Sequence, residues 1–439
     1  MKYVEPIKSF ILLFLVLLSL LFTFMIWNYK PNYPLQEPTQ KERNLTDEKK
    51  VLREVVKPYR LLFSSEAGFK GSDSTEKIDT IMGYLNSLEI RSFSLIDAPI
   101  SAKEINEMVR TQSHMTMFFQ TEIPIQVFGE MLSLEDTRYN EASFNRLIMN
   151  WSTVGQNRLV HLYFISTSGK SGYQAEFMIP DIEIFNQIFV EKPKSFFDYM
   201  EVERPNNLSL YIAEEPVKLA EYTYVKDEFS ADTLKNILFE DTTIVEKTSE
   251  GVQEKYTDDM SLMTLDTSMK SMNYVYPPTE SSAAIPPYRL LEDTFDFINQ
   301  HGGFTGDYRL TYMNTERHVA EYQMYWEGYP VYGSTGILTR LITTWGDDQI
   351  FRYRRPYYLF DSAIFQDDKV LKAGTKLVDE IHSYHELNFS SIDDIVVGYY
   401  LTEDPEKPLY RLEPSWFVLM GNIWVPLQPD RGGDEYGLE

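Results

Sequence analysis

The chain has 439 residues, which predicts two to four folded units at roughly 100 to 200 residues per domain. Its 43% apolar and 14% aromatic residues can form sizeable cores, which excludes disorder for the bulk of the chain. The 41 Lys and Arg residues against 66 Asp and Glu residues give a net charge of −25, which disfavours nucleic acid as a partner. The absence of Cys excludes disulfides, thiol catalysis and thiolate metal sites; it suits an exported bacterial protein, although cytosolic proteins can also lack Cys.

The N-terminal region holds a long uncharged segment, residues 9–29. Its apolar part, Phe10 to Trp27, would rise about 27 Å as a helix, close to the thickness of about 30 Å of a bilayer core. A cleaved signal peptide is the alternative, but it needs a shorter apolar stretch and a small-residue cleavage site. We therefore predict a transmembrane helix at 9–29, a cytoplasmic tail at 1–8 and an extracellular body, which makes a single-pass protein of the cell membrane.

Two hydroxyl side chains within this segment, Ser19 and Thr23, are four residues apart and share one face of the predicted helix. Small hydroxyl residues allow close approach and hydrogen bonding between helices, so these two form a candidate seam for a partner helix. Alternatively, each hydroxyl bonds to the carbonyl four residues earlier in its own helix. The sequence leaves both interpretations open.

The body is predicted to be α+β overall, with three domains after a linker. Prolines at 277–278 and 286–287 mark the clearest boundary. The predicted divisions are a linker with a charged helix at 30–57, an N-terminal α/β-type domain at 58–157, a central α+β domain at 158–285 and a C-terminal α+β domain at 286–439.

In the N-terminal domain the apolar spacing alternates between strand and helix patterns, which favours an α/β unit. Ser101 and Glu104 form a capping box that opens the second helix. The predicted elements are a strand at 59–64, a helix around 78–88, a strand at 91–96, a helix from 101 and a strand at 115–119.

The central domain opens with a predicted hairpin around a Ser/Gly-rich turn. The acidic stretch 240–259 is predicted to be a solvated surface. The predicted elements are the hairpin of 158–166 with 173–179, a helix at 181–190, an alternating stretch at 208–225, a helix capped by Ser230, and a hairpin of 261–265 with 271–276.

The C-terminal domain begins with a predicted helix that stops at Gly302 and Gly303. Long β stretches follow, as is typical of an antiparallel meander, and Glu327 with Gly328 suits a two-residue hairpin turn. The predicted strands are 308–313, 319–326, 329–332, 337–344, 350–360, 395–401 and 410–427, with a helix around 377–384.

The most metal-like pattern is His382-Ser-Tyr-His385-Glu386, because two imidazoles three residues apart on a helix can face one ion. Inverted zinc peptidases use H-x-x-E-H, and here the last two residues stand in the opposite order. No third ligand is identifiable. We therefore predict no metal site, and a surface or helix-end role for the two histidines.

Other motifs that resemble known chemistry are incomplete. The triplet 169–171 (GKS) lacks the upstream Gly of a phosphate loop and is predicted to be a turn. Ser74 and Lys77 match S-x-x-K, but neither S-D-N nor K-T-G occurs in the chain. The basic cluster Arg352, Arg354 and Arg355 could clamp a carboxylate, but cross-strand pairing with Asp or Glu is the favoured interpretation. No catalytic or cofactor-binding residue is therefore predicted.

Four segments together resemble a known family. They are IKSFILLFLVLLSLLFTFMIWNYKPNY, YTDDMSLMTLDTSMKSMNYVYP, EYQMYWEGYPVYG followed by TTWGDDQIFRYRRPYYLFD, and YRLEPSWFVLMGNIWVPL. In their order and spacing they are similar to the YycH (WalH) family over essentially the whole chain, although no single motif is diagnostic. EGYPVYG also resembles the turn of PepSY-like folds, so the last domain is expected to be PepSY-like and YycI-like.

The resemblance implies a bitopic accessory protein of Gram-positive bacteria. Such a protein acts with the related protein YycI on the WalK sensor kinase of the WalK/WalR (YycG/YycF) two-component system, which governs cell-wall metabolism. It implies no enzyme activity and no cofactor, and it supports the Ser19 and Thr23 seam. Tyr329 and Tyr332 are the candidate contacts of the ectodomain, because aromatic side chains often dominate interfaces. The alternative function is a cell-wall hydrolase or peptidase, and homo-oligomerisation stays open.

Overall fold

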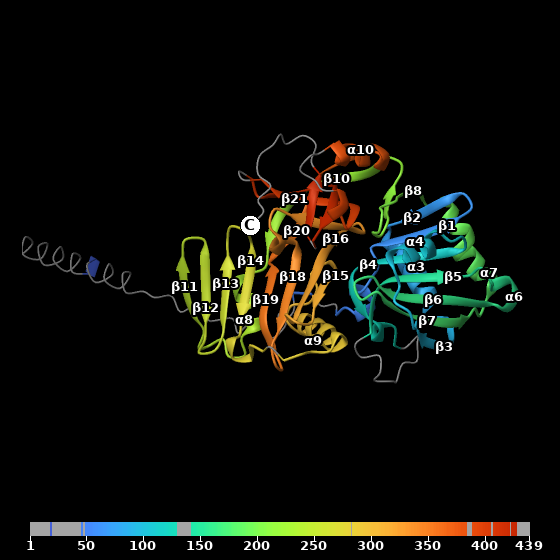
Figure 1. Cartoon of the computed structure of the whole chain (residues 1–439). Coiled ribbons are helices and arrows are strands. Elements are labelled where there is room, and N and C mark those ends of the chain that lie inside the picture. Colours follow the sequence, from blue (N-terminus) through green and yellow to red (C-terminus); the bar gives the residue numbers. More distant parts are fainter. Residues whose placement is uncertain are drawn as a thin grey trace, which may run out of the picture. The chain divides into compact units, whose positions relative to one another are not determined.

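The computed structural model describes residues 18–19, 45–46, 49–129, 142–281, 283–383, 389–404, 407–421 and 423–427. The chain divides into two compact units, 1–42 and 43–439. Of the predicted membrane segment only Leu18 and Ser19, both helical, are described. Among the described residues no helix is both long and apolar enough to cross a membrane. The predicted anchor therefore lies for the most part outside them, and the second unit carries the fold described below (Figure 1).

The first half of this unit is built on a nine-stranded sheet in the order β3-β7-β6-β5-β4-β1-β2-β8-β9. Its strands are β1 (Arg60–Ser65), β2 (Gly68–Ser72), β3 (Glu89–Leu95), β4 (His114–Pro124), β5 (Ser143–Asn150), β6 (Leu159–Ser166), β7 (Ser171–Met178), β8 (Phe197–Val202) and β9 (Leu210–Ala213). Its helices are α2 (Leu52–Val55), α3 (Thr75–Leu85), α4 (Ala102–Arg110), α6 (Val154–Asn157) and α7 (Ile182–Asn186).

Strands β1 and β4 of this sheet are buried on both faces because helices cover each side. Leu61 of β1 belongs to the same core cluster as Ile78 of α3 and Phe185 of α7. Its neighbour Leu62 belongs to the core cluster that includes Ile105 of α4. Successive side chains of a strand point to opposite faces, so α3 and α7 pack on one side of the sheet and α4 on the other.

All strand pairs of the first sheet are antiparallel. The predicted α/β character of the N-terminal domain is therefore wrong, and the fold is α+β. The helix α3 does join two strands, as the periodicity indicated, but β2 and β3 lie near opposite ends of the sheet and do not pair in parallel. An alternation of strand and helix patterns identifies the elements without fixing their partners.

The second half is built on a fourteen-stranded sheet in the order β11-β12-β13-β14-β19-β18-β16-β17-β21-β22-β10-β20, with β15 and β23 paired to β16 and β22. Its strands are β10 (Val217–Glu228), β11 (Glu246–Glu250), β12 (Gln253–Thr257), β13 (Leu262–Asp266), β14 (Ser271–Val275), β15 (Asp307–Asn314), β16 (Val319–Trp326), β17 (Tyr329–Gly333), β18 (Arg340–Trp345), β19 (Ile350–Pro356), β20 (Tyr358–Leu371), β21 (Asp394–Glu403), β22 (Leu409–Met420) and β23 (Ile423–Leu427). Its helices are α8 (Ala231–Leu238), α9 (Pro287–Gln300) and α10 (Gly374–Ser383).

Helices cover one face of this sheet along β13 to β19. Leu234 of α8 and Leu291 of α9 share a core cluster with Met263, Tyr322 and Leu341 of the strands. The parallel pair of β17 with β21 interrupts a sheet whose other pairs are antiparallel. The antiparallel meander expected for the C-terminal region is thus present, and its predicted likeness to PepSY and YycI stays a prediction.

The sheets divide the chain differently from the three predicted domains. Strands β5 and β6, on either side of the predicted boundary at 157/158, are neighbours in the first sheet. Strands β10 and β20, on either side of 285/286, pair along most of their length. The acidic stretch 240–259 is largely exposed, as predicted for a solvated surface, and it also contains the hairpin β11–β12, which was not predicted because its charged side chains mask the strand pattern.

Several local predictions are confirmed. Ser101 and Glu104 form the capping box of α4, and the hairpin β6–β7 turns at the predicted Ser/Gly-rich segment. The helix α9 ends before Gly302 and Gly303, both of which have positive φ. These features depend on short-range chemistry, which is why the sequence reveals them.

Candidate functional site at the junction of the two sheets

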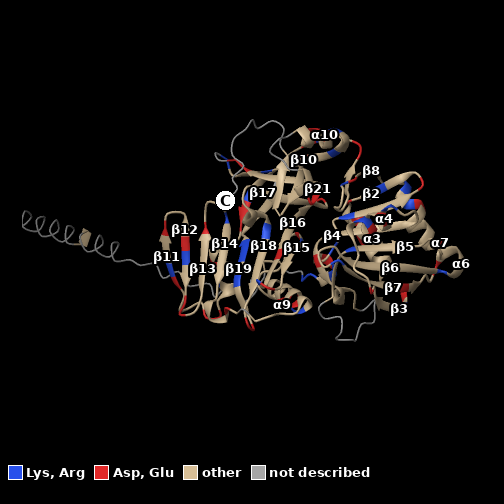
Figure 2. Ribbon diagram, viewed as in Figure 1, with Lys and Arg blue, Asp and Glu red and all other residues tan. Residues whose placement is uncertain are grey.

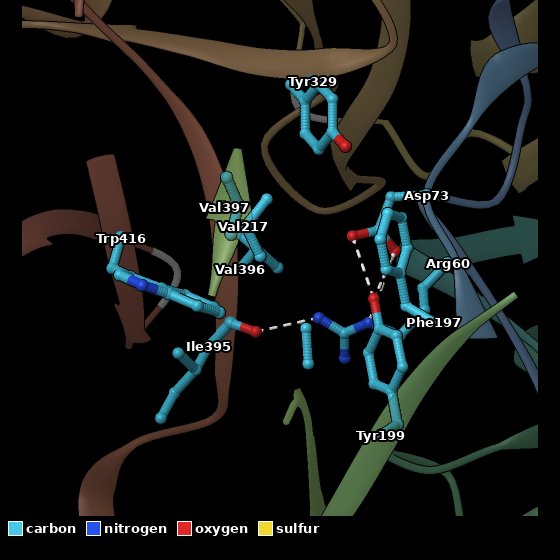
Figure 3. Close-up of a pocket in the computed structure, with 11 residues that line it drawn as sticks. Arg60, Asp73, Phe197, Tyr199, Val217, Tyr329, Ile395, Val396, Val397 and Trp416 are labelled. Atoms are coloured by element: carbon cyan, nitrogen blue, oxygen red, sulfur yellow. Dashed lines mark hydrogen bonds and ion pairs between the residues drawn. The ribbon is translucent and has the colours of Figure 1, made fainter. Parts of the chain in front are cut away.

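The fold places the start of β1 against the start of β21, and a buried ion cluster joins them. Arg60 is 2% exposed and donates to Asp394 Oδ1 at 3.1 Å and to the carbonyl of Ile395 at 2.8 Å. Its Nε lies 3.7 Å from the carboxylate of Asp73. Figure 3 shows Arg60 reaching from the first sheet toward Ile395 of the second, with Asp73 beside it. One guanidinium therefore links two carboxylates that are 321 residues apart in sequence, since 394 minus 73 is 321.

Two tyrosines complete the cluster. Tyr199 on β8 donates to both oxygens of Asp73, at 3.3 and 3.2 Å, and Tyr59 donates to Asp394. Burial raises the pKa of the Asp73 carboxyl above its ordinary range, and the nearby Arg60 charge opposes this shift. Burial also raises the pKa of both phenols. The tyrosines are thus neutral hydrogen-bond donors that help to solvate the two buried carboxylates.

A small pocket lies beside the cluster, between the two sheets (Figure 3). Tyr329 from β17 approaches it from the second sheet, while Asp73 and Tyr199 approach it from the first. The other lining residues are Arg60, Phe197, Ala213, Val217, Ile395, Val396, Val397 and Trp416. Arg60, Asp73, Tyr199 and the Ile395 carbonyl, which line this pocket, are already paired or hydrogen-bonded to one another, so the geometry fits a fixed contact between the sheets.

A second buried arginine reinforces the same junction. Arg309 on β15 is fully buried, donates to Thr75 Oγ1 at 2.6 Å and pairs with Asp307 at 3.0 Å. Its guanidinium carbon lies 4.1 Å from the centre of the Tyr325 ring. Because Thr75 opens α3, this contact again ties the N-terminal half to the C-terminal half.

Two family models match the chain, one for each half. The YycH protein N-terminal domain matches residues 5–192, and the YycH protein C-terminal domain matches residues 207–431. The chain belongs to the YycH family. The junction described above connects the two regions that the family models define, since Arg60 and Asp73 lie in the first and Asp394 in the second.

Comparison with known proteins gives a relative and a solved structure. The two-component system WalR/WalK regulatory protein YycH of Bacillus subtilis (strain 168) is 19% identical over 455 residues, which covers 99% of each chain. The crystal structure of YycH from Bacillus subtilis superposes with a TM-score of 0.75 at 16% identity, covering 88% of this chain and all of that one. The fold of this YycH family member is therefore that of the solved YycH.

The structure describes part of the predicted seam and places the two tyrosines. Ser19 lies in a helix, whereas Thr23 is outside the described residues, so the seam stays a prediction. Tyr332 is 5% exposed, and its ring centre is 4.6 Å from that of Phe417, so its burial argues against a contact role. Tyr329 is half-buried and packs on Tyr399 beside the pocket.

The histidine pair is only half described in this YycH family member. His382 lies in the last turn of α10, where its Nδ1 is 2.8 Å from the carbonyl of Val378 and its ring stacks on Phe389. His385 lies outside the described residues. Within the described part of the chain no group of three or more Asp, Glu or His side chains could hold a metal ion. The role of the pair stays a prediction.

The basic cluster differs from expectation. Within the described residues, Arg352, Arg354 and Arg355 form no ion pair with Asp or Glu. Arg355 is fully buried and donates to the carbonyl of Gly303 at 3.3 Å and to Thr305 Oγ1 at 3.0 Å, which fixes the loop after α9. The predicted cross-strand pairing is therefore wrong, because the residues opposite these arginines in the sheet are neutral.

The junction residues were not identified from the sequence. A cation directly before the apolar run of β1 was a usable signal, because a buried strand rarely begins with an unpaired charge. Its partner could not be found in this way, since Asp394 is 334 residues away. The family membership and the junction together define what the function must explain: two halves that a buried ion cluster joins.

Proposed function

We propose that this chain is a membrane-anchored, extracytoplasmic regulator of a WalK-type sensor histidine kinase that controls cell-wall metabolism. The observation that carries the proposal is the match over 99% of both chains to a relative named as a WalR/WalK regulatory protein. A match of this length includes the N-terminal segment 9–29 as well as the body. The proposed location is the cell membrane, with the N-terminus in the cytoplasm and the body outside.

The proposed mechanism is a population shift of the kinase. A regulator changes signalling only if it binds one kinase state better than the other, and a coupling free energy of about 1 to 3 kcal/mol changes the ratio of states about 5- to 150-fold. We propose that the helix at 9–29 contacts the kinase and a YycI-like bitopic partner, with Ser19 and Thr23 on the seam, and that the body makes further contacts. This role is regulatory and needs no catalytic group.

The test is a reporter of WalR-dependent transcription in a strain that lacks this protein. We expect the full chain to restore the reporter level of the parent strain, and a chain in which an unrelated membrane helix replaces residues 9–29 to restore less. A segment of residues 1–40 should restore part of the response if the helix itself regulates. No change of the reporter on deletion would contradict the proposal, and wall hydrolysis by the purified full chain would favour the hydrolase alternative.

A further inference from the structure

The second sheet has one face that the described helices do not cover. Along β14, β19 and β18 the side chains that point toward α8 and α9, such as Tyr274, Tyr353 and Leu341, are buried. The alternate side chains, which point the other way, are partly exposed along β13 and β14 and include Leu262, which is 37% exposed. We call this surface the open face. Its partly exposed side chains are Leu262, Val275, Glu321, Arg340, Arg352 and Arg354, and Ile342 points to the same face but is only 6% exposed.

The register of the strands puts the three arginines of the open face side by side. Arg352 lies between Val275 and Thr344, and Arg354 lies between Asn273 and Ile342. Glu321 is the cross-strand neighbour of Ile342, and Arg340 stands two residues before Ile342 on β18. Figure 2 shows basic residues on β18 and β19, the strands that carry these side chains. Arg352 and Arg354 are alternate residues of β19 on one face, and Arg340 on β18 is diagonal to Arg354. Diagonal neighbours lie within reach of long side chains, so the three cations share one patch.

The patch holds more positive charge than its own carboxylates neutralise. Glu321 pairs with Arg340 at 2.7 Å, and no other ion pair involves these arginines within the described residues. Three Arg against one Glu leave a formal charge of +2, in a chain whose net charge is −25. Burial and the neighbouring Arg352 both lower the pKa of Arg354, while Glu321 opposes this shift. The cations therefore repel one another in the free protein.

The hydrogen-bonding capacity of the patch is also unused. The Nε atoms of Arg340, Arg352 and Arg354 are buried and have no acceptor among the described residues. Asn273 Oδ1 is also buried and has no donor among them. An exposed sheet face commonly carries long polar side chains, but those hold their charges out in water. Here the Nε atoms lie close to the sheet with neither water access nor a partner, so the terminal nitrogens of these partly exposed side chains are the groups that a ligand can reach.

We propose that the open face binds an acidic segment of a protein partner, with carboxylates paired to Arg352 and Arg354. The guanidinium fork matches a carboxylate through two parallel hydrogen bonds, which favours Asp and Glu side chains as ligands. Val275 and Leu262 offer apolar contacts beside the cations, as a polypeptide with alternating acidic and apolar residues requires. A short acidic segment meets less of the repulsion from the chain's net charge of −25 than a long polyanion or an anionic membrane would. The inference does not depend on the proposed function.

The test measures fluorescence anisotropy of labelled peptides with the full chain in detergent. The probe is a peptide of alternating Leu and Glu, and its control has Gln in place of Glu. We expect binding of the Glu peptide to weaken about tenfold or more in Arg352→Gln/Arg354→Gln, because hydrogen bonds between ionised groups are the strong ones. The double variant Arg352→Lys/Arg354→Lys, which keeps both charges, should retain more of the binding.

A matched control removes two charges elsewhere. Arg91 and Lys103 are exposed side chains of the first half, so Arg91→Gln/Lys103→Gln should bind the Glu peptide as the unaltered chain does. Equal affinity in all variants, or equal binding of the Gln peptide, would overturn the proposal, and so would a Glu peptide that does not bind. Preferential binding of a glycerol phosphate oligomer or of phosphatidylglycerol vesicles would overturn it in favour of an anionic polymer or membrane.

Discussion

At the scale of single residues, Gly328 combines two constraints that the sequence reveals only in part. The turn between β16 and β17 has φ of 49° at Glu327 and 85° at Gly328, as a two-residue type I′ hairpin requires. Gly328 is also buried against the first half of the body, because a Cβ built on it would lie 2.8 Å from Thr75 Oγ1. Residues 327–328 therefore form a hairpin turn and also contact the first half of the body.

We expect Gly328→Ala to lower the free energy of unfolding by about 1 to 3 kcal/mol, from the strained backbone and the close approach to Thr75. The matched control is Gly251→Ala, in a turn with φ of 59° and open space around the built Cβ. That substitution adds only the backbone strain of a positive φ, so it should lower the free energy of unfolding by less than Gly328→Ala does. Chemical denaturation of both variants gives the comparison. Equal losses would mean that the contact with Thr75 contributes nothing.

At the scale of elements, the helix α4 shows how local chemistry fixes a boundary. Ser101 Oγ accepts from the backbone N–H of Glu104 at 3.3 Å, and the Glu104 carboxylate accepts from the backbone N–H of Ser101 at 2.8 Å. Hydrogen bonds to the Glu104 carboxylate from the Ser101 hydroxyl and from the Ser101 backbone N–H lower the pKa of this carboxyl. The cap of α3 is different, because Ser74 makes no side-chain hydrogen bond to its helix. The two N-cap serines therefore differ, because Ser101 makes a side-chain hydrogen bond to its helix and Ser74 does not.

We expect Ser101→Ala to lower the free energy of unfolding by about 1 kcal/mol, the usual effect of losing an N-cap hydrogen bond. Ser74→Ala should have a smaller effect, since no cap bond is lost. Chemical denaturation curves of the two variants, measured side by side, test this difference. A larger loss for Ser74→Ala would show that the capping box does not stabilise the body.

The features that could be predicted from the sequence are those set by residues close together in the chain. The cap at Ser101 and the turn at Glu327 with Gly328 depend on residues a few positions apart, and both were identified. The pairing of β10 with β20 joins residues far apart in the chain, so periodicity alone could not place it. The hairpin β11–β12 was missed because its exposed charged residues conceal the alternation that marks a strand.

The candidate site was the least predictable part. Arg60, Asp73 and Asp394 are ordinary charged residues in the sequence, and only the tertiary fold buries them together. Tyr332 was identified as a surface contact because aromatic residues are frequent at interfaces, yet its neighbours Phe417 and Trp424 enclose it in the second sheet. Burial depends on which elements pack together, and that information is not local.

At the scale of the whole molecule, the buried ion cluster predicts that the two halves of the body unfold together. Arg60 belongs to the first sheet, and its main ligands, Asp394 and the carbonyl of Ile395, belong to the second. Removing one partner of a buried pair leaves the other charge without compensation, which costs about 3 to 5 kcal/mol. The loss should therefore affect both sheets and not only the strand that carries the substitution.

We expect Asp394→Asn to lower the free energy of unfolding by about 3 to 5 kcal/mol in the full chain, because Arg60 then keeps a buried charge beside a neutral amide. Hydrogen exchange should accelerate alike in β5 and β6 of the first sheet and in β18 and β19 of the second. The control is Asp368→Asn, which removes an exposed ion pair with Lys218 and should cost no more than about 1 kcal/mol. Faster exchange in the second sheet alone would contradict the coupling, because the first sheet would then be stable without its ligand across the junction.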